Sequence, residues 1–230
     1  MKNNKIKIFI FARKNSKGVK NKNIVRINGT PLVVKAMNIA KQIVANKDIY
    51  LSSDSLKYKK IADANFINFI KRPKNLATSK SPEILSWKHA INFLKKKKIN
   101  FNTFVSLPST APLRKKIDVK KAIKKLTKNS DIVLTASDST RNPYFNMVKK
   151  NKNHFYDLVI KHKKIFRRQD APKTYDLNTV AFVSKPNFIL KAKSIFDGNV
   201  SISLVPIERS LDIDNKFDIK LAKLLMKNEK

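Results

Sequence analysis

The chain contains no cysteine, and this absence removes several kinds of chemistry at once. Disulfide bonds, thiolate catalysis and cysteine-bound zinc are all excluded. The three histidines, His89, His154 and His162, are scattered through the sequence and do not form a metal-binding pattern. The longest early apolar run, residues 8–12, is too short for a signal peptide or a membrane span. We therefore expect a soluble, cytoplasmic protein.

Acidic residues are also scarce, since 16 aspartates and glutamates oppose 51 lysines and arginines and leave a net charge of +35. Such a charge raises the question of nucleic-acid binding. However, only eight of the basic residues are arginine, the residue best suited to bidentate phosphate and base contacts. The lysines are spread along the whole chain. We interpret the charge as a solvated, lysine-rich surface that attracts anionic substrates, and we expect no nucleic-acid partner.

Strand and helix patterns alternate over most of the 230 residues, a length that fits one domain, residues 1–230. This alternation predicts an α/β fold with a mostly parallel sheet. Within it, Ser81 is the expected N-cap of a helix whose apolar face holds Trp87 in the core. Strands are predicted at residues 6–12, 48–53, 66–70, 103–107, 131–136, 179–183 and 200–205, and helices at residues 31–44, 56–64, 83–97, 118–127, 186–193 and 217–226.

The alternation stops between residues 138 and 178. This stretch is polar, aromatic and rich in turn residues, with a strand-like piece at residues 144–148. It does not have the pattern of another strand and helix unit. We expect an inserted lobe or arm here.

Open α/β sheets bind ligands at the carboxyl ends of their strands, and the first strand is followed there by a basic loop. Arg13, Ser16, Lys17 and Lys22, with the backbone amides around Gly18, are suited to cradle a polyphosphate. The Walker A pattern is absent. Because basic loops are common in this chain, the loop alone is an ambiguous signal.

Two further segments carry candidate residues. "LPSTAPLR", residues 107–114, offers Thr110 and Arg114 to a ligand, or is only a rigid connection stiffened by its prolines. "SLDID", residues 210–214, places Asp212 and Asp214 on one face of an extended segment. A magnesium ion between these carboxylates and substrate phosphates would relieve their repulsion. Alternatively, Asp214 caps the last helix and Asp212 is solvated.

These segments together resemble the CMP-sialic acid synthetases, the cytidylyltransferases that activate nine-carbon 2-keto sugar acids. The resemblance covers residues 5–225 and rests on "ARKNSKGVKNKNI", "LSSD", "KRPKNLA", "STAPLR", "RRQDAPKTYDLN" and "ERSLDID", in that order. The segment "RNPYFNMV", with "RQDAPKTYDLN", resembles the CMP-legionaminic acid branch more than the N-acetylneuraminate branch. Pro108 and Ser109 also stand where the sialic acid branch typically has Gln-Pro.

The resemblance implies a Rossmann-like nucleotidyltransferase fold, similar to glycosyltransferase-A, with a mixed, mostly parallel sheet. It also implies roles for single residues. The expected CTP-binding residues are Arg13, Ser16, Lys17, Lys22, Asn23 and Arg72, with Arg72 near the pyrimidine. The expected sugar-binding residues are Arg168, Thr110 and Asn178, with Arg168 near the substrate carboxylate. The expected catalytic residues are Arg13, Lys22, Asp212 and Asp214; the two aspartates bind Mg²⁺ (or another divalent cation such as Mn²⁺), or one acts as a base.

The resemblance further implies that residues 138–178 form a dimerisation lobe reaching the partner's active site, so that the protein is a homodimer. Its expected substrates are CTP and a nine-carbon keto sugar acid, with legionaminic acid favoured. Pseudaminic acid, N-acetylneuraminic acid and an eight-carbon keto acid remain alternatives. A non-catalytic, basic nucleic-acid-binding protein is the alternative from another functional class.

Overall fold

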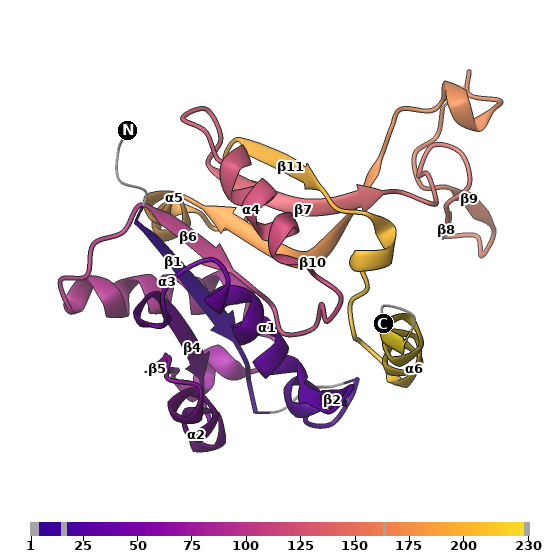
Figure 1. The fold of residues 1–230 in the computed structure, drawn as a ribbon. Coiled ribbons are helices and arrows are strands. Elements are labelled where there is room, and N and C mark those ends of the chain that lie inside the picture. The colour runs from indigo at the N-terminus through magenta and orange to yellow at the C-terminus, as the bar shows by residue number, and fades with distance from the viewer. Residues whose placement is uncertain (1–4, 15–17, 163, 228–230) are drawn as a thin grey trace.

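The computed structural model describes residues 5–14, 18–162 and 164–227. Its centre is a seven-stranded sheet with the order β11-β7-β10-β6-β1-β4-β5 (Figure 1). The strands are β1 (Ile6–Phe11), β4 (Ile49–Ser53), β5 (Asn68–Lys71), β6 (Thr103–Ser106), β7 (Ile132–Asp138), β10 (Tyr175–Ser184) and β11 (Val200–Leu204). Only β10 runs antiparallel to its neighbours, so the predicted mixed, mostly parallel sheet is confirmed.

Helices cover both faces of this sheet, as the alternation of side chains along β1 shows. Ile8 and Ile10 pack into a core with α1, α2 and α4, whereas Phe9 packs on the other side with α3 and α5. Trp87 of α3 is buried beside Phe9 and belongs to that second core, as predicted. The helices are α1 (Leu32–Lys41), α2 (Leu56–Ala64), α3 (Glu83–Lys96), α4 (Lys116–Lys125), α5 (Pro186–Lys191) and α6 (Lys216–Lys227).

A short hairpin joins the first strand region to α1. It pairs β2 (Arg26–Ile27) with β3 (Thr30–Pro31). Asn28 and Gly29 form its turn and both have positive φ, 48° and 74°. This Asn-Gly pair matches the backbone that tight hairpin turns require. The hairpin packs against α6, whose buried Ala222 shares a small core with it.

The inserted stretch forms an arm between β7 and β10, which projects from their far end (Figure 1). It carries the small hairpin of β8 (Val148–Lys150) and β9 (Tyr156–Leu158). The strand predicted at residues 144–148 is wrong for most of its length, because these residues precede β8 and form a turn. Asn142 causes this turn, since its side chain accepts a hydrogen bond from the amide of Tyr144 at 2.9 Å.

Candidate functional site

A pocket of about 390 Å³ lies at the carboxyl ends of β1, β5 and β6. In the sheet, β6 and β1 are neighbours, and β4 lies between β1 and β5. Because these strands are parallel, the loops that follow them meet at one edge of the sheet. The segment before α6 completes the wall. The lining residues are Phe11, Arg13, Gly18, Lys22, Asn23, Arg72, Leu76, Thr78, Ser79, Ser81, Glu83, Ser86, Pro108, Ser109, Thr110 and Asp214.

Asn23 ties the opening loop to the loop after β6. It is buried and belongs to the short 3-10 helix η1 (Lys22–Ile24). Its side-chain amide donates to the carbonyl of Arg13 at 3.1 Å, and its Oδ1 accepts from the hydroxyl of Ser109 at 2.5 Å. The Arg13 backbone is therefore held in place by a residue that is itself anchored in the protein. Ser16 and Lys17, the other predicted residues of this loop, lie outside the described residues.

Gly18 brings the same loop against the segment before α6. A Cβ atom at Gly18 would lie 2.1 Å from the backbone carbonyl oxygen of Asp214. Only glycine allows this approach. Close by, Lys22 Nζ pairs with Asp214 Oδ1 at 2.9 Å, although 73% of the Asp214 side chain remains exposed. The ion pair thus joins a largely buried lysine side chain, 15% exposed, to a carboxylate that remains accessible.

Asp214 does not cap the last helix, as one alternative held. That role belongs to Asn215, whose Oδ1 accepts from the amides of Phe217 and Asp218 at 2.8 and 3.2 Å. Asp218 reciprocates by accepting from the amide of Asn215 at 2.8 Å. This reciprocal pattern is a capping box. The carboxylate of Asp214 is therefore left to Lys22 and to the pocket.

Asp212 lies on the same segment but is not among the lining residues. Ile213 is fully buried between the two aspartates, and its amide donates to the carbonyl of Thr110 at 2.9 Å. Asp212 Oδ1 is buried and makes no hydrogen bond with any described residue. Burial is the main influence on the pKa of Glu83 and of Arg114, and the negative charge of Asp212 raises both pKa values. An orphaned carboxylate oxygen of this kind calls for a ligand, because burial without a partner is costly.

Asp212 and Asp214 are the residues of this site that could hold a metal ion. Within the described ranges 5–14, 18–162 and 164–227, no group of three or more acidic or histidine side chains is arranged to hold a metal. Magnesium is usually bound by one or two carboxylates together with substrate phosphates and water. The orphaned oxygen of Asp212 and the accessible carboxylate of Asp214 fit that pattern.

Arg72 is a buried residue of the pocket lining. It is 6% exposed, and burial lowers the pKa of its guanidinium, with a smaller contribution from Arg13 in the same direction. One terminal nitrogen donates to Ser86 Oγ at 3.0 Å, and Ser86 donates in turn to the carbonyl of Leu76 at 3.2 Å. The Nε atom of Arg72 is buried and has no hydrogen-bond partner among the described residues. The guanidinium is thus fixed while one donor is left over.

The start of α3 differs from the sequence-based prediction. The helix has Pro82 at its N-cap, without a side-chain hydrogen bond. Ser81 is not the cap, because its Oγ is buried without a partner and the residue lines the pocket. Glu83, the first helical residue, also lines the pocket, and its carboxylate accepts from the indole of Trp87 at 3.3 Å. Although residue Glu83 as a whole is exposed, loss of water around its carboxyl raises the pKa of that group.

Arg114 supports the loop after β6 instead of lining the pocket. It is 4% exposed and donates to the carbonyls of Ala111 and Thr179, both at 3.1 Å, and of Pro108. Burial lowers the pKa of Arg114 to about 9, so it stays charged at neutral pH. The interpretation of "LPSTAPLR" as a rigid connection therefore applies to Arg114, whereas Thr110 lies in the pocket wall.

The structure does not bring the other two predicted sugar-side residues to the pocket of the same chain. Arg168 lies in the arm, in the 3-10 helix η4 (Arg168–Asp170), and donates to the carbonyl of Thr140 at 3.4 Å. Asn178 is buried in β10, where its Oδ1 accepts from the amide of Val180 at 3.3 Å. One chain therefore brings together Arg13, Lys22, Asn23 and Arg72 of the predicted nucleotide residues but leaves Arg168 apart.

Sequence reasoning missed Glu83, Ser86 and the hydroxyls of Thr78 and Ser79. The first two belong to a helix whose pattern indicates only an apolar face toward the core. A carboxylate in the first helical turn is also common for electrostatic reasons, so it gave no signal.

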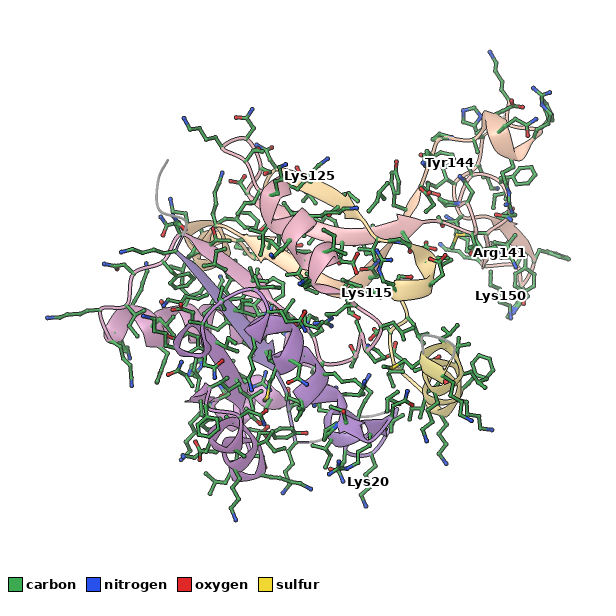
Figure 2. The ribbon with its side chains drawn as sticks, viewed as in Figure 1. Lys20, Lys115, Lys125, Arg141, Tyr144 and Lys150 are labelled. Carbon is green, nitrogen blue, oxygen red and sulfur yellow. The ribbon has the colours of Figure 1, made fainter. Side chains whose placement is uncertain are left out.

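The basic side chains labelled in Figure 2, such as Lys20, Lys125 and Lys150, lie on separate parts of the molecule. This distribution agrees with a general basic surface.

Comparison with known proteins gives a consistent result. A family model described as cytidylyltransferase matches residues 8–220. The chain is 33% identical to "Post-translational flagellin modification protein B" of Campylobacter coli, over 96% of this chain and 94% of that one. It is 32% identical to a CMP-N,N'-diacetyllegionaminic acid synthase of Campylobacter jejuni, covering 94% and 93%. A pseudaminic acid cytidylyltransferase of Campylobacter jejuni is 30% identical, covering 95% and 94%.

A solved structure shares the fold. It is a CMP:2-keto-3-deoxy-manno-octonic acid synthetase complexed with CTP, with a TM-score of 0.73 over 98% of this chain and 100% of that chain. The sequence identity is 13%, so this likeness concerns the fold. No helix within the described ranges is long and apolar enough to cross a membrane.

Proposed function

The chain belongs to the cytidylyltransferase family, and from this premise we propose that it transfers CMP from CTP to legionaminic acid. It is a nucleotidyltransferase that makes CMP-sugars from nonulosonic acids, the nine-carbon 2-keto sugar acids. The family assignment replaces the alternative of a non-catalytic nucleic-acid-binding protein. The legionaminic acid acceptor is the finer proposal, supported by "RNPYFNMV" and by the relative named for that sugar.

The observation that carries the nucleotide half of this proposal is the pocket at the strand ends. Arg13, Lys22 and Arg72 reach it from two loops, and Asn23 fixes the loop that holds the first two. Cations on a pre-organised loop are suited to a triphosphate, since little reorganisation is needed when it binds. We assign the triphosphate to Arg13 and Lys22, together with Ser16 and Lys17, and the ribose to Asn23.

The chemistry asked of these residues is mainly positioning and charge neutralisation. The anomeric hydroxyl oxygen of the sugar acid forms a bond to the α-phosphorus as the bond to pyrophosphate breaks. The hydroxyl proton is lost to a base, for which the carboxylates of Asp212 and Asp214 are the candidates. Arg13 and Lys22 stabilise the negative charge on the departing pyrophosphate. Lys22 exchanges its partner Asp214 for phosphate oxygens in this arrangement.

Asp212 and Asp214 would hold Mg²⁺ or Mn²⁺ together with phosphate oxygens of the substrate. When bound, such an ion polarises the α-phosphate and lowers the pKa of the attacking hydroxyl. The orphaned Oδ1 of Asp212 supports this role, because it has no hydrogen-bond partner among the described residues. Titration with Mg²⁺ by calorimetry, in the presence of CTP, should show binding that Asp212→Asn weakens; unchanged binding would contradict the assignment.

Arg168 requires a second chain if it is to meet the substrate carboxylate. The arm that carries it exposes large apolar side chains, including Phe155 at 73% and Phe166 at 81%. Large exposed apolar groups on a projecting arm are typical of an interface. We propose a homodimer in which the arm, residues 138–178, reaches the partner's pocket. The buried Asn178 would support the root of the arm on the sugar side, and Thr110 would contact the sugar from the pocket wall.

Mixing two inactive variants tests this arrangement. Chains with Arg13→Ala and chains with Arg168→Ala are expected to be inactive alone. If the arm acts across the dimer, mixed dimers contain one intact site. Random exchange of subunits should then restore about a quarter of the wild-type rate. No recovery despite verified subunit exchange would contradict a shared site, and a monomer in light scattering would contradict the dimer.

The acceptor is tested by comparing kcat/KM for legionaminic, pseudaminic and N-acetylneuraminic acids and an eight-carbon keto acid. We expect legionaminic acid to be preferred by at least tenfold, since acyl groups and hydroxyls are read by polar contacts. Preference for another acid would keep the nucleotidyl transfer and overturn the acceptor. Because CTP is the co-substrate, we also propose that the protein acts in the cytoplasm, which cell fractionation would test.

A further inference from the structure

The pocket lining combines two chemically different groups of side chains. Arg13 and Lys22 provide positive charge near the opening loop. The wall formed by residues 76–86 is rich in hydroxyls and carries Glu83. Asp214, the other acidic lining residue, is already paired with Lys22. A carboxylate repels phosphates, so the surroundings of Glu83 suit an uncharged portion of the nucleotide.

Glu83 is held in a defined position. Its carboxylate accepts from Trp87 Nε1 at 3.3 Å. Trp87 is itself fixed, because its ring lies 5.5 and 5.4 Å from the rings of Phe104 and Phe182 in the core. Glu83 also occupies the first turn of α3, where the helix dipole favours a negative charge. A rigid acceptor is therefore presented to the pocket.

Two unused donors accompany this acceptor. Arg72 Nε and Ser81 Oγ are both buried without a hydrogen-bond partner among the described residues, and both residues line the pocket. Arg72 is more than nine-tenths buried, so water cannot readily satisfy it. Buried donors without partners are rare because they cost free energy. Together these atoms form a wall with one fixed acceptor and two available donors.

This pattern matches cytosine and opposes uracil. Cytosine presents an amino group at C4 as donor, with N3 and O2 as acceptors, whereas uracil presents the O4 acceptor in place of the amino group. Burial raises the pKa of Glu83, but the hydrogen bond from Trp87 and the charge of Arg72 favour its ionised form. An ionised carboxylate can only accept, and a guanidinium can only donate. We propose that Glu83 accepts a hydrogen bond from the 4-amino group of the CTP base and is the residue that rejects UTP. This inference rests on CTP as the proposed substrate.

The test is the ratio of kcat/KM for CTP to kcat/KM for UTP in the Glu83→Gln variant. Glutamine keeps the length and an acceptor for Trp87, but it places an amide donor where cytosine also donates. We expect the ratio to fall by about 10- to 100-fold, since a hydrogen bond to a charged group contributes about 1.5–3 kcal/mol. The ratio is internal to one variant, so partial misfolding changes both terms equally.

Glu208→Gln is the matched control, because Glu208 is exposed and does not line the pocket. Its ratio should stay at the wild-type value. Equal losses for CTP and UTP in Glu83→Gln would overturn the proposal and leave Glu83 as a structural partner of Trp87. Calorimetric affinities for the two nucleotides, measured without any sugar acid, give the same comparison. They remain informative even if legionaminic acid is the wrong acceptor.

Discussion

Replacing Gly18 by alanine probes the contact that joins the opening loop to the aspartate segment. The new Cβ would lie 2.1 Å from the carbonyl oxygen of Asp214. Carbon and oxygen atoms normally approach no closer than about 3.3 Å, so the two segments must separate by about 1 Å. A displacement of about 1 Å at a catalytic site can reduce the rate about 100-fold. That loss corresponds to about 2.7 kcal/mol of transition-state stabilisation.

Stability should change little in Gly18→Ala, because the backbone at this position does not have a positive φ and the contact lies at an exposed site. Gly29→Ala is the matched control with the opposite signature. Gly29 has a φ of 74°, and nothing lies within 4 Å of its added Cβ. It should lose about 1–2 kcal/mol of stability through backbone strain while keeping its activity.

The assay is pyrophosphate release with CTP and the preferred sugar acid, paired with urea unfolding of each variant. We expect Gly18→Ala to be slow and stable, and Gly29→Ala to be fast and destabilised. Activity of Gly18→Ala within threefold of wild type would refute the claim that close contact between Gly18 and Asp214 positions the site.

Three further predictions concern other contacts. Asn23→Ala leaves the Ser109 hydroxyl without its acceptor, so the free energy of unfolding in urea should fall by about 1–3 kcal/mol. The KM for CTP should also rise, and an unchanged KM would contradict the positioning role of Asn23. Asn215→Ala should cost about 1 kcal/mol in unfolding with activity retained. Asp214→Asn should instead slow pyrophosphate release at least about tenfold, which corresponds to about 1.36 kcal/mol of activation free energy, and leave stability unchanged. Lost activity in Asn215→Ala together with lost stability in Asp214→Asn would contradict the assignment of Asn215 as the cap and of Asp214 as a site residue. Burial, with nearby positive charges, lowers the pKa of His89 below 6.5. The free energy of unfolding should therefore fall as the pH drops from about 6.5 through that lowered pKa. His89→Gln should make this fall smaller, as measured by urea unfolding at a series of pH values.

Most of the fold could be predicted because its strands and helices bury regular apolar patterns. The α3 helix follows directly from its periodic apolar face, and β1 from its continuous apolar run. The strand β10 was predicted only at residues 179–183, yet it begins at Tyr175. Residues 175–177 are polar or exposed and pair with the far end of β7, so no alternation marks them.

The site could be predicted in part, because motifs that follow parallel strands must meet at one edge of the sheet. Arg13, Lys22, Asn23, Arg72 and Asp214 meet there as expected. The sequence did not reveal that Arg114 is consumed by backbone carbonyls, since its burial depends on tertiary packing. Nor could it reveal Glu83, which only the docking of α3 brings to the pocket. The distance of Arg168 from the pocket depends on the arm's direction, which local sequence does not encode.

The measurement that tests the account most directly follows the α-phosphorus of CTP. Wild-type protein is incubated with α-³²P-labelled CTP, magnesium and legionaminic acid, beside Arg13→Ala and the surface control Arg26→Ala. We predict that the label appears in the sugar product with one pyrophosphate released per product, in wild type and Arg26→Ala but at least about 100-fold more slowly in Arg13→Ala. Label that stays in free nucleotide, or equal rates in Arg13→Ala and wild type, would contradict CMP transfer to this acid in this pocket.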